Sequence, residues 1–347
     1  MEKFTTPRVL IVGAGAMGIV VGHNLSLAKA SVTYLVRPGN VERLGRPQML
    51  YSYNDNTLKA FDDYDVITDH ADIAKGRFDY IITTLDGASM QSDDGVELTK
   101  AIGKAALGSD TRVIQGALFF DSRRWFQHVS GLPGDQFTNG YLCIHAYPSR
   151  AVTLSLHGKT DPALLAKADL AYIDSMDNSL ILSDSAPAVA KGFAEVYNAC
   201  GVSHCGIVPE EGIAMMINTL FAMFAGCDLL GWPKFSEIDP SDDVWCLAIA
   251  AMKEIQGLSI YGEAGRAAVE ATTEAGVLEG NVAWEQQMLP LDLQEFNRFH
   301  HGGKVSKQDH AIRAACLAAG RAEGKDMSAL SELIRRVESN VRSTLAR

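Results

Sequence analysis

The chain has 347 residues, a formal net charge of −11 and 47% hydrophobic residues. This length predicts two domains, and this composition is typical of a globular protein with a sizeable core. An acidic surface repels phosphate backbones, which argues against general nucleic-acid binding and leaves room only for a local basic pocket.

The six cysteines form no C-x-x-C pair and match no zinc-site spacing. We therefore expect reduced thiols, a cytoplasmic protein and no metal. The N-terminal MEKFTTPRVLIVG lacks the apolar core of a signal peptide. Residues 213–230 are apolar enough for a membrane span, but Asn218 and Asp228 interrupt them and no basic cluster flanks them. We expect a buried core helix and no membrane contact.

The first elements in chain order form one motif. Residues 8–12 (RVLIV) predict a buried strand, residues 17–29 a helix, and residues 31–36 (SVTYLV) a second strand. Strand, glycine-rich turn, helix and strand within about thirty residues make a βαβ unit, whose crossover implies parallel strands.

The pattern changes near Pro187. Before it, we predict strands at 48–53 and 57–61 joined by a hairpin, a strand at 80–84, a helix at 96–106, and strands at 112–114, 141–146 and 151–156. After it, we predict helices at 188–200, 210–230, 242–270, 292–299, 306–321 and 330–345. The sequence thus predicts a Rossmann-type doubly wound α/β domain at 1–187 and an all-helical domain at 188–347.

A glycine-rich loop follows the first predicted strand and matches G-x-G-x-x-G. It consists of Gly13, Ala14, Gly15, Ala16, Met17 and Gly18. The glycines permit a tight turn, close approach of the backbone to a pyrophosphate, and close packing of helix and strand. Because this loop opens a helix directly after an apolar strand, it has the context that dinucleotide binding requires.

The end of the second strand predicts the cofactor. NAD-binding domains usually place a carboxylate there for the ribose 2′-hydroxyl, but this strand continues Arg37-Pro38-Gly39-Asn40, with no acidic residue before Glu42. The Arg37 guanidinium has the charge and shape to clamp a 2′-phosphate; a solvated surface arginine is the alternative. We therefore predict NADP(H).

The stretch VLIVGAGAMGIVVGHNLSLAKASVTYLVR is similar to the opening of the ketopantoate reductase family. Residues 217–220 (INTL) resemble its I-N-P-L segment, His145 its strand-associated histidine, and residues 293–295 (LQE) its L-Q-D. The order of these matches implies a two-domain reductase that binds a small-molecule substrate between its domains and forms a homodimer through the helical domain.

The same resemblance exposes departures at the family's polar site. The catalytic lysine corresponds to Glu210 and an asparagine to Ala214, while Gln115 replaces another asparagine, beside the cofactor. Asp86 occupies the position of a second family lysine, and Leu291 that of the substrate-binding serine. Lys307 occupies the position of the late glutamate, whereas Asn218 is retained. Reducing a ketone needs a hydride and a proton donor for the developing alkoxide. Since Glu210 would repel a substrate carboxylate, ketopantoate is not the expected substrate.

Two interpretations stay open. In the first, the protein is an oxidoreductase for another small carbonyl, hydroxy or imine compound. Glu210, Lys307 and His145 are then the acid–base candidates, and Asn218 orients the substrate. In the second, it is a nucleotide-binding regulatory or redox-sensing protein without turnover. The adjacent His300 and His301 suggest a loop rim rather than a metal site, because neighbouring side chains on a helix diverge.

Overall fold

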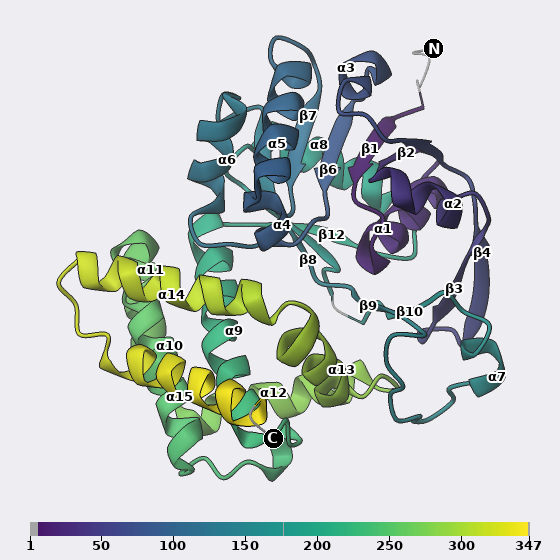
Figure 1. The fold of residues 1–347 in the computed structure, drawn as a ribbon. Coiled ribbons are helices and arrows are strands. Elements are labelled where there is room, and N and C mark those ends of the chain that lie inside the picture. Colours follow the sequence, from purple (N-terminus) through teal and green to yellow (C-terminus); the bar gives the residue numbers. More distant parts are fainter. Residues whose placement is uncertain (1–5, 176, 346–347) are drawn as a thin grey trace. The chain divides into compact units, whose positions relative to one another are not determined.

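The structure, a computed structural model, describes residues 6–175 and 177–345 (Figure 1). The chain divides into two compact units. The first comprises Met1–Thr153 and Gly158–Pro209, and the second Leu154–His157 and Glu210–Arg347. The first is α/β and the second helical, so the predicted fold class is confirmed.

The predicted boundary at residue 187 falls inside the first unit. Helix α8 (Pro187–Asn198) packs against strands β8, β11 and β12 of that unit's main sheet. Val189, Ala190 and Phe193 of this helix are fully buried. The α/β unit therefore extends to Pro209, because burying this helix and the strand after it completes the sheet.

The main sheet has eight strands in the order β12-β11-β8-β7-β6-β1-β2-β5. Their bounds are β1 (Arg8–Val12), β2 (Ser31–Leu35), β5 (Asp65–Ile67), β6 (Tyr80–Thr83), β7 (Arg112–Gln115), β8 (Phe137–Leu142), β11 (Leu180–Ser183) and β12 (Cys205–Val208). Six neighbouring strands of this sheet are parallel and follow the usual doubly wound order: β5, β2, β1, β6, β7 and β8. Strand β11 runs antiparallel to β8, and β12 runs parallel to β11.

The first βαβ unit forms as predicted. Strand β1 is apolar and buried from Val9 to Val12, as expected for a central strand of a parallel sheet that is covered on both faces. Helix α1 (Ala16–Leu27) packs so closely on β2 that a Cβ at Gly22 would lie 1.9 Å from the Tyr34 hydroxyl oxygen. That hydroxyl donates to the Gly18 carbonyl oxygen at 3.0 Å.

A second sheet in this unit has the strand order β4-β3-β10-β9. Its strands are β3 (Gln48–Ser52), β4 (Thr57–Phe61), β9 (His145–Pro148) and β10 (Leu170–Ile173). The predicted hairpin is confirmed as the antiparallel pair β3–β4. Helix α1 contacts β9 and β10 as well as β1 and β2, so it lies between the two sheets (Figure 1).

The predicted strands at 141–146 and 151–156 are wrong. The first is two strands, because β8 ends at Leu142 in the main sheet and β9 begins at His145 in the second sheet. The second has no regular structure. Its residues Leu154–His157 belong instead to the helical unit. There the Ser155 backbone N–H and hydroxyl donate to the two Glu295 carboxylate oxygens at 2.5 and 2.7 Å. His157 Nε2 lies 3.0 Å from Asp292 Oδ2.

Further helices complete the α/β unit. They are the 3₁₀ turn η1 (Pro38–Asn40) and α2 (Val41–Leu44), α3 (Asp72–Gly76), α4 (Gly87–Gln91), α5 (Asp93–Ala106), α6 (Ser122–Ser130) and α7 (Pro162–Leu165). Helix α5 contains the predicted helix 96–106 and begins earlier. The Ser92 hydroxyl caps it by accepting from the Gly95 N–H at 3.2 Å.

The helical unit is built around α9 (Glu210–Leu230), whose predicted bounds are confirmed. It packs against α10 (Asp243–Gln256), α11 (Gly262–Ala271), α14 (Ser306–Ala322) and α15 (Ser328–Leu345). Helices α12 (Glu274–Met288) and α13 (Leu293–Phe299) complete the unit. The predicted helix 242–270 is two helices, because the chain turns through the 3₁₀ segment Ser259–Tyr261 and Gly262, whose φ is +53°.

Helix α9 is long and apolar enough to cross a membrane, and 56% of its apolar window is buried inside the structure. Phe221, Met223 and Phe224 on this helix are buried within the unit. The arrangement matches the core helix that the sequence predicts.

Candidate functional site

The glycine-rich loop after β1 has a backbone conformation and a packing that depend on its glycines. Gly13 has a φ of +101°, which only glycine adopts without strain. A Cβ at Gly18 would lie 2.6 Å from the Gly13 carbonyl oxygen and 2.7 Å from Thr84 Oγ1. The Thr84 hydroxyl donates to the Val12 and Gly13 carbonyl oxygens, both at 3.1 Å. Two of the three glycines are therefore required by the packing of the protein itself.

Gly15 has a different environment. It is the N-cap of α1, and a Cβ placed on it would meet no atom within 4 Å. No side chain caps the helix there, and its first turn contains no acidic residue. The first N–H groups of α1 thus have no side-chain cap, and they carry the positive end of the helix dipole. This arrangement fits the pyrophosphate of a dinucleotide.

Arg37 follows the buried Val36, which is the first residue after β2. Its side chain is exposed, and the residue caps the 3₁₀ turn Pro38–Asn40 through its backbone. Among the residues that the structure describes, no carboxylate forms an ion pair with Arg37. Its charge is therefore available to an anionic ligand.

Gln115 ends β7 and Asp86 follows β6, which pairs with β1 on one side and β7 on the other. Gln115 is 1% exposed, and its side-chain amide donates to the Ala117 carbonyl oxygen at 2.9 Å. Asp86 caps α4: one carboxylate oxygen accepts from the Ser89 N–H at 2.8 Å and the other from the Ser89 hydroxyl at 2.9 Å. Both side chains thus shape local turns, and contact of Gln115 with a cofactor stays a prediction.

The acid–base candidates lie in both units. His145 is the first residue of β9, opposite Ile173 in β10, and is half-buried. Glu210 begins α9 and is half-buried, whereas Lys307 is exposed in the first turn of α14. Their participation in one site stays a prediction.

Asn218 is buried in α9, and its side-chain amide donates to the Tyr261 hydroxyl at 2.7 Å. Tyr261 is itself 1% exposed, so this hydrogen bond ties α9 to the chain between α10 and α11. Sequence reasoning gave Asn218 a role toward substrate and missed this partner, because the contact joins positions 43 residues apart.

The two adjacent histidines are not a loop rim. They begin a π-helical segment, His300–Lys304, between α13 and α14. The His301 ring stacks on Phe224 with centroids 3.9 Å apart, and its Nδ1 lies 2.8 Å from Asp309 Oδ2. The described residues contain no cluster of three or more histidine, cysteine or acidic side chains able to hold a metal.

Asp309, the partner of His301, and the nearby Arg313 are both buried, with exposed fractions of 2% and 4%. Burial raises the pKa of the Asp309 carboxyl to about 7 and lowers the pKa of His301 to about 3. Burial also lowers the pKa of Arg313, whose guanidinium donates to the Phe221 carbonyl oxygen at 3.0 Å. The helical unit thus holds a titratable cluster that sequence reasoning missed, because the π-helical turn decides which residues meet.

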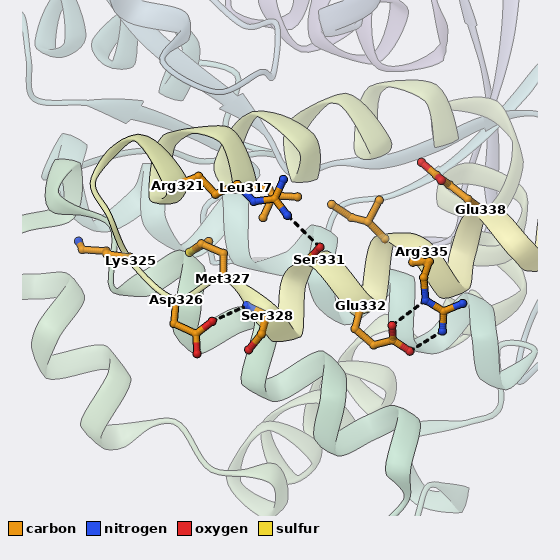
Figure 2. A pocket seen from close by; sticks show the side chains of 11 residues that line it. Leu317, Arg321, Lys325, Asp326, Met327, Ser328, Ser331, Glu332, Arg335 and Glu338 are labelled. Carbon is orange, nitrogen blue, oxygen red and sulfur yellow. Dashed lines mark hydrogen bonds and ion pairs between the residues drawn. The ribbon is translucent and has the colours of Figure 1, made fainter.

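A cavity of about 680 Å³ lies between α14 and α15 of the helical unit (Figure 2). Its polar side chains are largely paired with one another. Arg335 binds both carboxylate oxygens of Glu332 at 2.7 Å, and Arg321 donates to the Ser331 hydroxyl at 3.1 Å (Figure 2). None of the predicted site residues lines it.

Comparison with known proteins supports the resemblance. Residues 9–103 match the sequence model of the ketopantoate reductase PanE/ApbA family. No curated protein matches the chain significantly by sequence. The chain resembles the ketopantoate reductases. Since the matched residues span the first βαβ unit through most of α5, the family likeness in sequence is carried by the α/β unit.

Solved structures show the same fold along nearly the whole chain. The 2-dehydropantoate 2-reductase from Geobacter metallireducens GS-15 is 18% identical, with a TM-score of 0.63 over 96% of this chain and 99% of that chain. A D-mandelate dehydrogenase with NADH is 14% identical, with a TM-score of 0.62 over 97% and 99%. A dimeric ketopantoate reductase from Staphylococcus aureus is also 14% identical, with a TM-score of 0.53 over 96% and 98%.

Proposed function

We propose that this protein is an NADP(H)-dependent oxidoreductase of ketopantoate reductase-like type. The observations that carry the proposal are the uncapped N-terminus of α1 behind Gly15 and the exposed Arg37 that follows the second strand, unpaired among the described residues. Backbone N–H groups at a helix N-terminus suit a pyrophosphate, and an arginine at the end of the second strand suits a 2′-phosphate. The resemblance to a family of reductases supports the same conclusion.

In this proposal, some residues of the chain bind the cofactor and others transfer a proton. A bound nicotinamide cofactor supplies or accepts the hydride. The loop from Gly13 to Gly18 holds the diphosphate, and Arg37 selects the phosphorylated ribose. A side chain that titrates near neutral pH must then give a proton to, or take one from, the substrate's oxygen or nitrogen.

We propose a substrate other than ketopantoate: a small carbonyl, hydroxy or imine compound. Glu210 stands where the family has its catalytic lysine, and a carboxylate there favours a cationic group and repels a 2-keto acid. Glu210, Lys307 and His145 are the proton-transfer candidates. Asn218 orients the substrate, with its amide held by Tyr261.

The deciding experiment measures NADPH binding and turnover separately. Fluorescence titration gives the Kd for NADPH, and absorbance at the nicotinamide band follows oxidation against panels of 2-keto acids, aldehydes, ketones and imines. Turnover with one panel supports the proposal. Binding without turnover in any panel favours the alternative, a regulatory or redox-sensing nucleotide binder. Efficient reduction of ketopantoate would refute the altered substrate.

Two variants sharpen the assay. Arg37→Asp should weaken NADPH binding by at least tenfold, because it replaces attraction to the 2′-phosphate by repulsion; unchanged affinity would refute the clamp. Glu210→Lys should raise the rate with 2-keto acids relative to the wild type. We also propose that the protein is a cytoplasmic homodimer formed through the helical unit. Light scattering measures the mass of the assembly directly.

A further inference from the structure

Three arginines follow β2, and all three are exposed: Arg37, Arg43 and Arg46. Their charges differ in availability. Arg46 is neutralised by a two-pronged ion pair with Asp169, with nitrogen–oxygen distances of 2.8 and 2.7 Å. In the part of the chain that the structure describes, no such ion pair neutralises Arg37 or Arg43. In a chain of net charge −11, these two cations are available for an anion.

The Arg43 guanidinium is fixed against the glycine-rich loop. Its Nη2 donates to the Ala14 carbonyl oxygen at 2.7 Å, and its Nη1 donates to Gln48 Oε1 at 3.1 Å. Gln48 is fully buried, and its own amide donates to the Arg43 and Arg46 carbonyl oxygens at 2.8 and 2.9 Å. The side chain is thus ordered before any ligand arrives, which lowers the entropic cost of binding one.

These contacts place Arg43 beside the same strand ends as Arg37. The Gly13 N–H donates to the Leu35 carbonyl oxygen at 3.0 Å. Ala14 is the next residue after Gly13, and Arg37 is two residues after Leu35. In dinucleotide-binding folds, the adenosine ribose lies at this junction of the glycine-rich loop and the second strand.

We propose that Arg43 is a second specificity residue for the 2′-phosphate of NADP(H), and this inference rests on the proposed function. A phosphate monoester carries a charge near −2 at neutral pH, which one guanidinium neutralises only by half. Arg43 uses two N–H groups on Ala14 and Gln48, and a guanidinium has five. The remaining donors form charge-assisted hydrogen bonds to phosphate oxygens.

The test compares NADPH and NADH binding to Arg43→Gln by fluorescence titration and calorimetry. We expect Kd for NADPH to rise by about tenfold or more, since a hydrogen bond to a charged group contributes that much. Kd for NADH, which lacks the 2′-phosphate, should change by less than about threefold. Arg43→Lys should fall between, because an ammonium keeps the charge but loses the planar fork.

Arg46→Gln is the matched control. It removes the same charge three residues away, from a guanidinium that Asp169 already neutralises, so both dinucleotides should bind as they do to the wild type. Circular dichroism shows that each variant is folded. Equal weakening of NADPH and NADH in Arg43→Gln would overturn the proposal, because Arg43 would then act only by holding the loop.

Two further outcomes separate this inference from the proposed function. If the wild type binds NADPH and Arg43→Gln binds it equally well, the inference fails and the proposed function stands. If the wild type binds neither dinucleotide, the proposed function fails and the inference fails with it.

Discussion

His301 and Asp309 change protonation in opposite directions when the helical unit folds. Burial holds the Asp309 carboxyl neutral up to about pH 7, whereas the unfolded chain releases that proton near its ordinary pKa of 3.8. Asp309 therefore makes stability fall as the pH rises through this window. Burial keeps His301 neutral down to about pH 3, whereas the unfolded chain takes up a proton below its ordinary pKa of 6.5. His301 therefore makes stability rise with pH.

Where the two windows overlap, the contributions cancel in the wild type, and single substitutions expose them. One proton is worth about 1.4 kcal/mol per pH unit. Asp309→Asn removes the contribution that falls as the pH rises. The free energy of unfolding of this variant, minus that of the wild type, should therefore increase by about 4 kcal/mol from pH 4 to pH 7. His301→Asn removes the contribution that rises with pH. The free energy of unfolding of this variant, minus that of the wild type, should therefore decrease by about 3 kcal/mol from pH 4 to pH 6.5.

Urea unfolding at half-unit pH steps measures both differences. Three of the four tryptophans, Trp232, Trp245 and Trp284, lie in the helical unit, so their fluorescence reports mainly on that unit. The double variant is the control and should follow the wild type across the overlapping window. Single variants whose stability runs parallel to the wild type at every pH would refute the assignment of these protons.

Other substitutions test the loop and the core of α9. Gly15→Ala should keep the wild-type melting temperature, because its Cβ meets no atom within 4 Å, yet weaken NADPH binding by blocking the approach to the helix end. Gly18→Ala should instead cost about 1–3 kcal/mol of stability, since its Cβ would lie 2.6 Å from the Gly13 carbonyl oxygen; scanning fluorimetry with and without NADPH separates the two effects. Tyr261→Phe should cost about 1–3 kcal/mol, because it leaves the buried Asn218 amide without its acceptor. An unchanged unfolding midpoint in urea would contradict that reasoning.

Sequence patterns predicted the elements whose signals are local. The βαβ start, the hairpin around residues 54–56 and helix α9 each follow from a short run of hydrophobic periodicity and turn residues. The strands β10, β11 and β12 were missed, since each has only four residues and is defined by partners distant in the chain. The position of α8 was misjudged for the same reason: a helix's sequence does not state which sheet it covers.

The candidate site divides in the same way. The loop glycines and Arg37 were predictable, because their roles depend on spacing within one βαβ unit. The Arg43 contact with Ala14 spans 29 residues and depends on how the chain after β2 returns to the loop. The His301–Asp309 pair depends on a π-helical segment, which shifts side chains away from the positions that regular helical spacing would give.

The segment Leu154–His157 gives the chain an unusual connectivity. It leaves the α/β unit, contributes to the helical unit through Asp292 and Glu295, and returns before β10. The backbone therefore passes between the units three times, and the helical unit cannot be isolated as one continuous stretch of gene. A fragment beginning at Glu210 would lack four residues of its own unit, and the Asp292 and Glu295 carboxylates would lose their contacts with His157 and Ser155. Proteolytic cleavage between residues 209 and 210 would likewise leave these four residues on a different polypeptide from the rest of their unit.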